Sequence, residues 1–310
     1  MAHNWNMYSK SWQWNARNRM NKIIPVGIIV LLSVVLFNCS GQVALVKSEK
    51  DSIIFSVMGD VPRSDEEKII LQEQIRKHNQ HSSAQFVFHV GDIKSGDTPC
   101  DEENYGLVAD YLKKFSVPVF IIPGDNEWND CENPAQAWDY WNQYFLAFDQ
   151  NWKVPFKVQR QQNYPVNTSF IKNNILFIAL NLVGGRIHDQ TEWDQMQINA
   201  AQWIDDQTTI NNVDAVIIFA QASLDEKHVL FTEQFTKSIN DFGKPVLFIH
   251  GDGHIWLYDE SYLVPNMIRV QVDKGGIADP LEVTVKSDSL VNFKFNRNPF
   301  NEKDILIENR

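Results

Sequence analysis

Four short apolar stretches of this chain are each followed by the pair Gly-Asp. The stretches cover residues 53–58, 86–90, 119–123 and 246–250, and the aspartates after them are Asp60, Asp92, Asp125 and Asp252. Short runs of β-branched and aromatic residues bounded by glycine are typical of buried, largely parallel strands. Residues that follow such strands gather at the carboxyl edge of the sheet, where α/β proteins build their sites. Four carboxylates at one edge repel one another unless a cation lies between them, so the pattern predicts a metal site.

Amphipathic stretches between the apolar runs predict helices with one buried face. Apolar residues recur there at intervals of three and four, which is the helical period. The predicted helices cover 65–79 behind a capping box at Ser64, cover 103–115, follow the caps Asn133-Pro134 and Thr191, and end before Gly243. The residues predicted to be buried are Trp138, Trp141, Phe145, Phe148, Trp193, Met196, Ala200, Trp203, Phe231, Phe235 and Ile239.

The later part of the chain is rich in strand patterns. A hairpin is predicted at 168–171 and 175–182, a buried strand at 215–219, and terminal strands at 267–272, 281–285 and 290–295. The order is therefore β-α-β-α-β-α, a hairpin, β-α-β and terminal strands. It predicts an α/β fold in which two mixed β-sheets pack face to face with helices outside. Residues 46–310 are long enough for one such domain with a sizeable core.

The first 45 residues predict a leader and a short tether outside the fold. Residues 23–37 are almost wholly apolar, and a run of this length suits the core of a signal peptide better than a spanning helix. Residues 36–41 resemble a bacterial lipobox, whose cysteine is lipidated after cleavage. We therefore expect an exported lipoprotein of the bacterial cell envelope (periplasm or outer membrane), with Cys39 as the lipid anchor and Met20 as a better start than Met1. Plain secretion and a retained membrane anchor are the alternatives.

Export would place the two remaining cysteines, Cys100 and Cys131, in an oxidising compartment. The simplest expectation is a disulfide between them, and two unpaired thiols are the alternative. Both cysteines lie a few residues past a strand-end aspartate, Asp92 in one case and Asp125 in the other. A disulfide would therefore pin two loops of the predicted site together.

The net charge of the chain limits the kinds of partner that it can bind. Residues 1–39 hold four of the 28 basic residues and none of the 39 acidic ones, so their removal changes the net charge from −11 to 24 − 39 = −15. Such a charge argues against nucleic acid or an anionic membrane surface as a partner. An anionic substrate would be attracted by a local cation, and membrane contact would come from the N-terminal lipid or signal segment.

The Gly-Asp pairs also form a pattern that resembles the calcineurin-like metallophosphoesterases, over roughly residues 52–260. The motifs of that family are D-x-H, G-D-x-x-D/N, G-N-H-D/E, a lone His after a strand, and G-H-x-H. The order of the motifs, their spacing and the strands before them match this chain. Four family histidines are replaced here, by Pro62, Asn126, Gln221 and Asp252. The family's asparagine is replaced by Asp125. Two local phrases, GDIK…PC and PGDNEW…C, indicate a divergent branch.

The resemblance implies a four-layer αββα fold and two divalent metal ions that share one aspartate. It places Asp60, Asp92 and His254 at one metal, and Asp92, Asp125, Gln221 and Asp252 at the other. An oxygen-rich set with one imidazole favours Mn, Mg or Ca over Zn. Strand-end aspartates can instead cap helices or close turns, and Gln221 could simply satisfy backbone groups.

The activity implied by the resemblance is hydrolysis of a small phosphate ester by attack of a metal-bridging hydroxide. The residue that would donate a proton to the leaving group is the least certain part of this mechanism. Asn126 occupies the position of the family's catalytic His and cannot deliver a proton near neutral pH, whereas Glu127 or a metal-bound water could. Asn126 could still hydrogen-bond a phosphate oxygen. Lys94 and Arg186 are candidates for contacting the phosphate, with solvated surface charges as the alternative.

Two classes of function compete on this sequence. One is an exported, metal-dependent phosphoesterase, and the other is a catalytically weak or inactive relative that binds a metal and an anionic ligand at the envelope. The residues Pro62 and Asn126 favour the second class, while the acidic and amide groups at the other ligand positions favour the first. An unrelated exported hydrolase has no support because the chain lacks a Gly-x-Ser-x-Gly elbow. The ester class and the oligomeric state are open.

Overall fold

A computed structural model describes residues 52–287 and 290–300 of the chain, all within the unit Lys47–Arg310. The predicted leader, with Cys39 as its lipid anchor and Met20 as its start, lies outside the described residues. No helix in the described part of the chain is both long and apolar enough to cross a bilayer.

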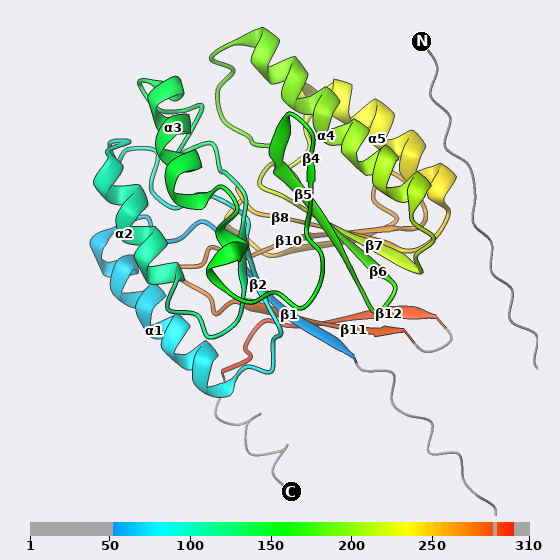
Figure 1. The fold of residues 1–310 in the computed structure, drawn as a ribbon, viewed down its shortest axis with the longest axis horizontal. Coiled ribbons are helices and arrows are strands. Elements are labelled where there is room, and N and C mark those ends of the chain that lie inside the picture. Colours follow the sequence, from blue (N-terminus) through cyan, green and yellow to red (C-terminus); the bar gives the residue numbers. More distant parts are fainter. Residues whose placement is uncertain (1–51, 288–289, 301–310) are drawn as a thin grey trace, which may run out of the picture. The chain divides into compact units, whose positions relative to one another are not determined.

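The described strands form two sheets (Figure 1). Sheet A has five strands in the order β12-β11-β1-β2-β3, and sheet B has seven in the order β4-β5-β6-β7-β8-β10-β9. The strands of sheet A are β1 (Ile53–Met58), β2 (Val87–His89), β3 (Val119–Ile121), β11 (Leu281–Ser287) and β12 (Val291–Asn296). Those of sheet B are β4 (Gln159–Gln161), β5 (Tyr164–Lys172), β6 (Ile175–Ala179), β7 (Ala215–Ala220), β8 (Val246–His250), β9 (Leu257–Glu260) and β10 (Met267–Gln271).

The strands that precede the Gly-Asp pairs, which are β1, β2 and β3 in sheet A and β8 in sheet B, run parallel to a neighbouring strand, so strand ends lie side by side. In sheet A, Met58 pairs with His89 and His89 pairs with Ile121. In sheet B, Ala220 at the end of β7 lies opposite His250 at the end of β8. The loops after these strands therefore meet at the carboxyl rim of the two sheets, as the sequence predicts.

Helices cover the outer face of each sheet (Figure 1). The helices α1 (Asp65–His81), α2 (Glu102–Leu112) and α3 (Pro134–Phe145) lie on the side of sheet A, and α4 (Gln190–Ile210) and α5 (Val229–Phe242) lie on that of sheet B. Two 3₁₀ turns, Phe148–Asn151 and Glu226–His228, complete the described helical segments. The predicted αββα arrangement of two mixed sheets is confirmed.

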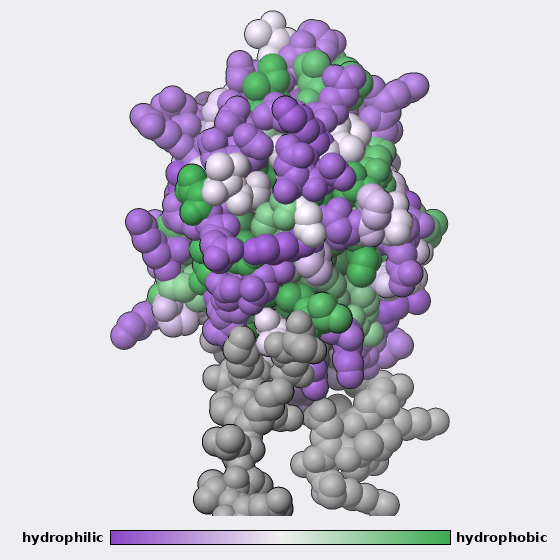
Figure 2. All heavy atoms as spheres, turned by 90° about the vertical axis from the view of Figure 1, so that its right-hand side faces the viewer, coloured by the Kyte–Doolittle hydropathy of each residue, from purple (hydrophilic) through white to green (hydrophobic). Residues whose placement is uncertain are grey.

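Phenylalanine rings fill the space between the sheets. Phe88 of β2 stacks on Phe219 of β7 with ring centroids 3.6 Å apart, and Phe55 of β1 packs edge-on to Phe177 of β6 at 5.6 Å. With helices on the outer faces as well, the central strands are buried on both sides, and this explains their continuous apolar runs. The face of the molecule in Figure 2 mixes hydrophilic side chains with scattered hydrophobic ones.

Local details differ from the predictions at a few positions. Asp189, not Thr191, caps α4, because its carboxylate accepts the N–H of Glu192 at 2.9 Å. Trp138 is only partly buried, whereas the other residues predicted to be buried are indeed buried. The short strands β4 and β9 were not predicted, since neither contains a run of apolar residues.

Candidate metal centre

Four of the predicted ligand residues have an uncommon backbone conformation. The φ angles of Asp60, Asp92, Asp252 and His254 are 56°, 61°, 68° and 63°, which is the left-handed region. Residues with a Cβ avoid this region for steric reasons, and each that adopts it costs about 1–3 kcal/mol. The surrounding structure must therefore hold these residues in place, as is typical of functional sites.

The rim brings the predicted carboxylates into two groups that share Asp92. Ligand atoms of Asp60, Asp92 and His254 lie within 4.8 Å of one another, and so do those of Asp92, Asp125 and Asp252. The shared residue is the one that the sequence places between two metals. The geometry is thus compatible with two adjacent cations, while the role of each residue as a ligand stays a prediction.

Asp60 shows most directly that the site suits a cation. Its carboxylate is 1% exposed, and neither of its oxygens has a hydrogen-bond donor in the described part of the chain. His254 Nε2 lies 3.1 Å from Asp60 Oδ1 without the geometry of a hydrogen bond, and this nitrogen has no partner either. A buried carboxylate without a donor is strongly unfavourable. A metal ion held by Asp60, Asp92 and His254 would satisfy these atoms.

Asp92 has the most protein contacts of the predicted ligands. Its Oδ2 accepts hydrogen bonds from Asn126 Nδ2 at 2.7 Å and from Arg63 Nη1 at 3.2 Å, and its Oδ1 accepts the N–H of Asn126 at 3.4 Å. Burial and the neighbouring carboxylates raise the pKa of Asp92 well above its usual value. A Cβ at Gly124 would lie 2.1 Å from Asp92 Oδ1, so the loop after β3 can approach only with glycine there.

The second group contains Asp125 and Asp252, with Gln221 beside them. Burial raises the pKa of Asp125, and it raises the pKa of Asp252 to about 6 with help from the charges of Asp125 and Asp60. Gln221 donates from Nε2 to Asp125 Oδ1 at 2.8 Å, and its Oε1 accepts the N–H of Gly184 at 2.7 Å. The amide of Gln221 thus orients Asp125 and satisfies a backbone group in this structure, and its role as a metal ligand stays a prediction.

Glu127 is fully buried and faces backbone groups. Its oxygens accept three N–H groups, from Gly124 at 2.6 Å, Asp92 at 3.1 Å and Ile93 at 3.2 Å. Burial nevertheless raises the pKa of Glu127 to about 7. These contacts fasten the loop after β3 to the loop after β2. The predicted role of Glu127 as a proton donor finds no supporting contact here.

The two predicted phosphate contacts, Lys94 and Arg186, point at backbone carbonyls. Lys94 is 3% exposed, and its Nζ donates to the carbonyls of Asn126 at 2.5 Å and Ser95 at 2.9 Å. It is therefore neither a solvated surface charge nor a free phosphate contact in this structure. Arg186 donates from its guanidinium to the carbonyls of Asn129 and Cys131, and it holds the loop that leads to α3.

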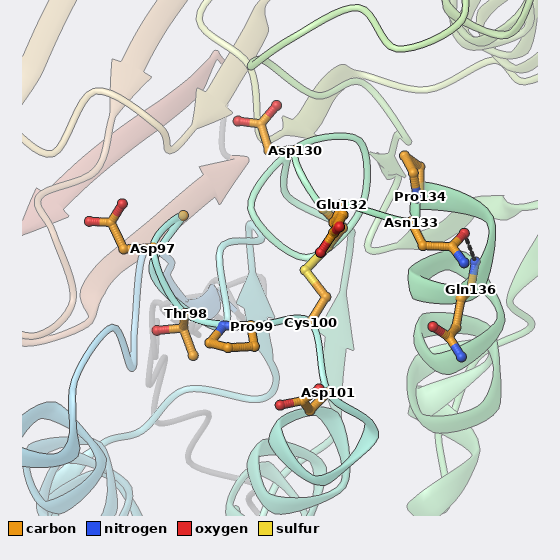
Figure 3. A pocket seen from close by; sticks show the side chains of 12 residues that line it. Asp97, Thr98, Pro99, Cys100, Asp101, Asp130, Glu132, Asn133, Pro134 and Gln136 are labelled. Atoms are coloured by element: carbon orange, nitrogen blue, oxygen red, sulfur yellow. Dashed lines mark hydrogen bonds between the residues drawn. A yellow bond between two sulfur atoms is a disulfide. The ribbon is translucent and has the colours of Figure 1, made fainter.

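A disulfide joins Cys100 to Cys131, with their Cα atoms 5.9 Å apart (Figure 3). Both sulfur atoms lie 3.6 Å from the carbonyl oxygen of Asn126, so the disulfide packs against the loop that contacts Asp92. Beside it opens a pocket of about 750 Å³. Its lining includes the carboxylates of Asp97, Asp101, Asp130 and Glu132, and no Lys or Arg.

Arg63 is a residue of the site that the sequence analysis missed. Its guanidinium lies 3.2 Å from Asp92 Oδ2, and its side chain is 18% exposed. The available signal was its position, three residues after Asp60 in a strand-end loop. Lys94, which was predicted as a phosphate contact, lies two residues after Asp92.

Comparisons with known proteins agree on the fold. The family model of the calcineurin-like phosphoesterases matches residues 55–256. Among solved structures, the chain is similar to GAP50, described as the anchor in the inner membrane complex of Plasmodium, with 11% identity, a TM-score of 0.51, and coverage of 79% of this chain and 84% of that one. It is also similar to the 5′-nucleotidase from Candida albicans, with 11% identity and a TM-score of 0.50, over 82% of this chain but only 53% of the nucleotidase. No curated protein matches the chain.

Proposed function

This chain belongs to the calcineurin-like phosphoesterase family, and we propose that it is an exported, metal-dependent phosphoesterase acting on a small phosphate ester. Family membership supports a metal-dependent phosphoesterase in general. The observation that carries the proposal for this chain is the pair of ligand groups that share Asp92. The buried oxygens of Asp60, which have no donor of their own, add to its support.

The donor set suggests the kind of metal. We assign Asp60, Asp92 and His254 to one ion and Asp92, Asp125 and Asp252 to the other, with Gln221 as a further oxygen donor if its amide turns. Carboxylate oxygens predominate over the single imidazole, which favours Mn, Mg or Ca over Zn. When bound, such ions lower the pKa of a water and neutralise charge on phosphoryl oxygens.

The residues around the ions have separate tasks in this proposal. Asn126 and Arg63 donate to Asp92 Oδ2 and so fix the orientation of the shared carboxylate. Glu127 and Lys94 hold the two loops that carry Asp92 and Asp125. Asn126 stands where the family has its catalytic histidine, and an amide cannot protonate the leaving group. We therefore expect a preference for esters whose leaving group needs no protonation, such as a phenol.

The same loss supports an alternative function. A relative without a proton donor could be catalytically weak or inactive and bind a metal and an anionic ligand at the envelope. The hydrogen bond from Asn126 to Asp92 favours this reading, because it commits the side chain at the catalytic position to orienting a carboxylate. The fold leaves both readings open, since it occurs in a protein described as an anchor and in a nucleotidase.

Export is proposed on two grounds. The leader contains an apolar run and a lipobox-like segment ending in Cys39, and the pair Cys100–Cys131 has disulfide geometry, which suits an oxidising compartment. Mass spectrometry of the mature N-terminus tests this proposal. Lipid on Cys39 would support a lipoprotein, and an intact Met20 in envelope fractions would contradict cleavage and lipidation.

Hydrolysis of p-nitrophenyl phosphate and of its bis-ester is the first test of activity. The full-length protein is stripped with a chelator and given back Mn, Mg, Ca or Zn, beside the variants Asp92→Asn and Asp110→Asn. Asp110 is an exposed aspartate of α2, paired with Lys113, and serves as the charge-matched control. We expect turnover that metal restores, a loss on the order of 10³-fold in Asp92→Asn, and no change in Asp110→Asn.

Two other results would contradict the proposed phosphoesterase activity. No turnover, together with a metal-dependent rise in Tm that Asp92→Asn abolishes, would support the binding protein. No turnover and no metal response would mean that the rim carboxylates are only structural.

A further inference from the structure

A second pocket, of about 270 Å³, opens beside Ile93 and Lys94, the two residues that follow Asp92. It lies between the loop after β1 and the loop after β2, and Ile93 and Lys94 form part of its wall. Three basic residues, Arg63, Lys68 and Lys94, and one acidic residue, Asp65, line it. Arg63 joins the pocket to the shared carboxylate, because it also contacts Asp92. Basic residues outnumber the acidic one in this pocket, unlike in the 750 Å³ pocket beside the disulfide.

Two of the three basic residues are already engaged by the protein. Lys68 Nζ pairs with Asp65 Oδ1 at 2.8 Å. Lys94 Nζ donates to two backbone carbonyls. The guanidinium of Arg63 makes one contact in the described part of the chain, from Nη1 to Asp92 Oδ2. Its Nε and Nη2 groups have no protein acceptor there, so Arg63 has donors free for a ligand.

The backbone of Arg63 is fixed by the start of α1. Glu67 was predicted to complete a capping box with Ser64, but its Oε2 instead accepts the N–H of Arg63 at 2.7 Å. Glu67 Oε1 pairs in turn with Lys274 Nζ at 2.5 Å. Because both the backbone and one guanidinium nitrogen are held, the free N–H groups of Arg63 are positioned before any ligand arrives, and this lowers the entropic cost of binding.

The charges that line the two pockets differ, and this difference favours one of them for binding an anion. The 750 Å³ pocket presents four carboxylates and no basic residue, so a phosphoryl group would be repelled there (Figure 3). On the Arg63 side, a planar guanidinium with two free donors suits the oxygens of a phosphate, which it can contact in bidentate fashion.

We propose that Arg63 binds an oxygen of the substrate's phosphoryl group from the wall of the 270 Å³ pocket, an inference that rests on the proposed function and names the anion-binding residue of its site. Nη1 bonds Asp92, while Nε and Nη2 face the ligand. The residue links the shared carboxylate to the substrate, and the pocket that it lines receives the non-reacting side of the phosphoryl group.

Inorganic phosphate is the probe that tests this proposal. Its dissociation constant is measured by calorimetry on the full-length protein with Mn²⁺ bound, in the wild type, Arg63→Gln, Arg63→Lys and Arg76→Gln. Arg76 is a charge-matched control on α1, exposed and paired with Glu73. The affinity for Mn²⁺ is measured in the same proteins without phosphate, because it separates a phosphate contact from a residue that only orients Asp92.

We expect Arg63→Gln to weaken phosphate binding by about 10- to 100-fold, which is typical for the loss of a charge-assisted hydrogen bond. Arg63→Lys should recover part of that loss, and Arg76→Gln should stay within twofold. The affinity for Mn²⁺ should hold or rise in Arg63→Gln, since a competing positive charge beside Asp92 is gone.

Three results would overturn the inference. The first is unchanged phosphate affinity in Arg63→Gln, and the second is no phosphate binding by the wild type at millimolar concentration. The third is a parallel loss of Mn²⁺ and phosphate, which would make Arg63 a positioning residue for Asp92. Phosphate binding that depends on Arg63 in a protein without turnover would uphold the inference while the proposed enzymatic function fails.

Discussion

The two sheets contribute to the rim in different ways. The sheet-A loops, which follow β1, β2 and β3, carry Asp60, Asp92 and Asp125, and these residues are 1%, 1% and 6% exposed. The sheet-B loop after β8 carries Asp252, which is partly exposed, and His254, whose side chain is 39% exposed. The half formed by sheet A is thus buried before any ligand binds, and the half formed by the loop after β8 lies open, although Gln221 after β7 is 0% exposed.

The difference extends to the supporting contacts. The disulfide, the three N–H groups on Glu127 and the buried ammonium of Lys94 join the loops after β2 and β3 to one another. In the described part of the chain, His254 has no hydrogen bond to its ring nitrogen Nε2. A rigid, negatively charged half can attract a cation, and an open half can then add its ligands around it. Sheet A thus supplies the buried, cross-linked carboxylates of the candidate centre, and the loop after β8 supplies its exposed groups.

Removing the disulfide should break the rigid half most severely. For two cysteines 31 residues apart, the double variant Cys100→Ala, Cys131→Ala should lose about 3–4 kcal/mol of unfolding free energy, since the unfolded chain is no longer constrained. Urea unfolding of the metal-free protein measures the loss, with the reduced wild type as a reference. A loss of unfolding free energy below about 1 kcal/mol would contradict a stabilising role of the disulfide.

The loops of the rigid half should depend next on the carboxylate of Glu127. Glu127→Gln keeps the shape but offers one acceptor oxygen to three backbone N–H groups, and we expect a loss of about 2–3 kcal/mol. Glu103→Gln, at an exposed glutamate of α2, is the matched control. Chemical unfolding in chelator gives both values. Equal stability of the two variants would mean that the three hydrogen bonds contribute little.

The sequence predicted the fold because the central strands carry a strong signal. Strands buried on both faces read as continuous apolar runs, so β1, β7 and β8 could be located closely, and a glycine also marks the turn after β1 and after β8. Caps were less certain, because Asp189 and Thr191 are both good capping residues two positions apart, and only the packing of α4 selects between them. Short strands such as β9 depend on a partner strand rather than on their own pattern.

The sequence predicted the site residues whose positions are set by the ends of parallel strands. It did not predict the residues whose roles depend on contacts between segments far apart in the sequence. Asp60, Asp92, Asp125 and Asp252 could be grouped because parallel strands align their carboxyl ends. The role of Glu127 could not be foreseen, since two of its donors lie more than 30 positions away in the sequence. Arg63 was missed for the same reason: its contact with Asp92 spans two loops.

The folding stability of the sheet-A half should fall at acidic pH because of His78, which lies away from the rim, as well as because of the rim carboxylates. His78 of α1 contacts Ser56 Oγ of β1 at 3.1 Å and packs edge-on against the rings of Phe115 and Phe300. Burial lowers the pKa of His78 to about 4, so the unfolded chain binds the proton first as the pH falls below about 6.5. Stability is therefore lost between pH 6.5 and pH 4, by about 2 kcal/mol at pH 5.

The variant His78→Gln isolates this contribution. Its unfolding free energy should fall by about 2 kcal/mol less than that of the wild type between pH 7 and pH 5, with both proteins in chelator. The rim carboxylates titrate in both proteins and cancel in the comparison. Identical pH slopes would place the acid sensitivity elsewhere.

The open half should show the smallest effect on the metal-free protein. His254→Ala removes a side chain that is 39% exposed and whose Nε2 has no hydrogen bond, so the unfolding free energy should change by less than about 0.5 kcal/mol. The rise in Tm on adding Mn²⁺ should nevertheless shrink, because one ligand of the first group is gone and binding stabilises only the folded state. Control variant Tyr258→Ala, at a more exposed position on β9, should keep the full rise in Tm. A large loss of unfolding free energy in the metal-free protein would show that His254 is a structural contact of Asp60. The distinction between a rigid half and an open half would then not hold for His254.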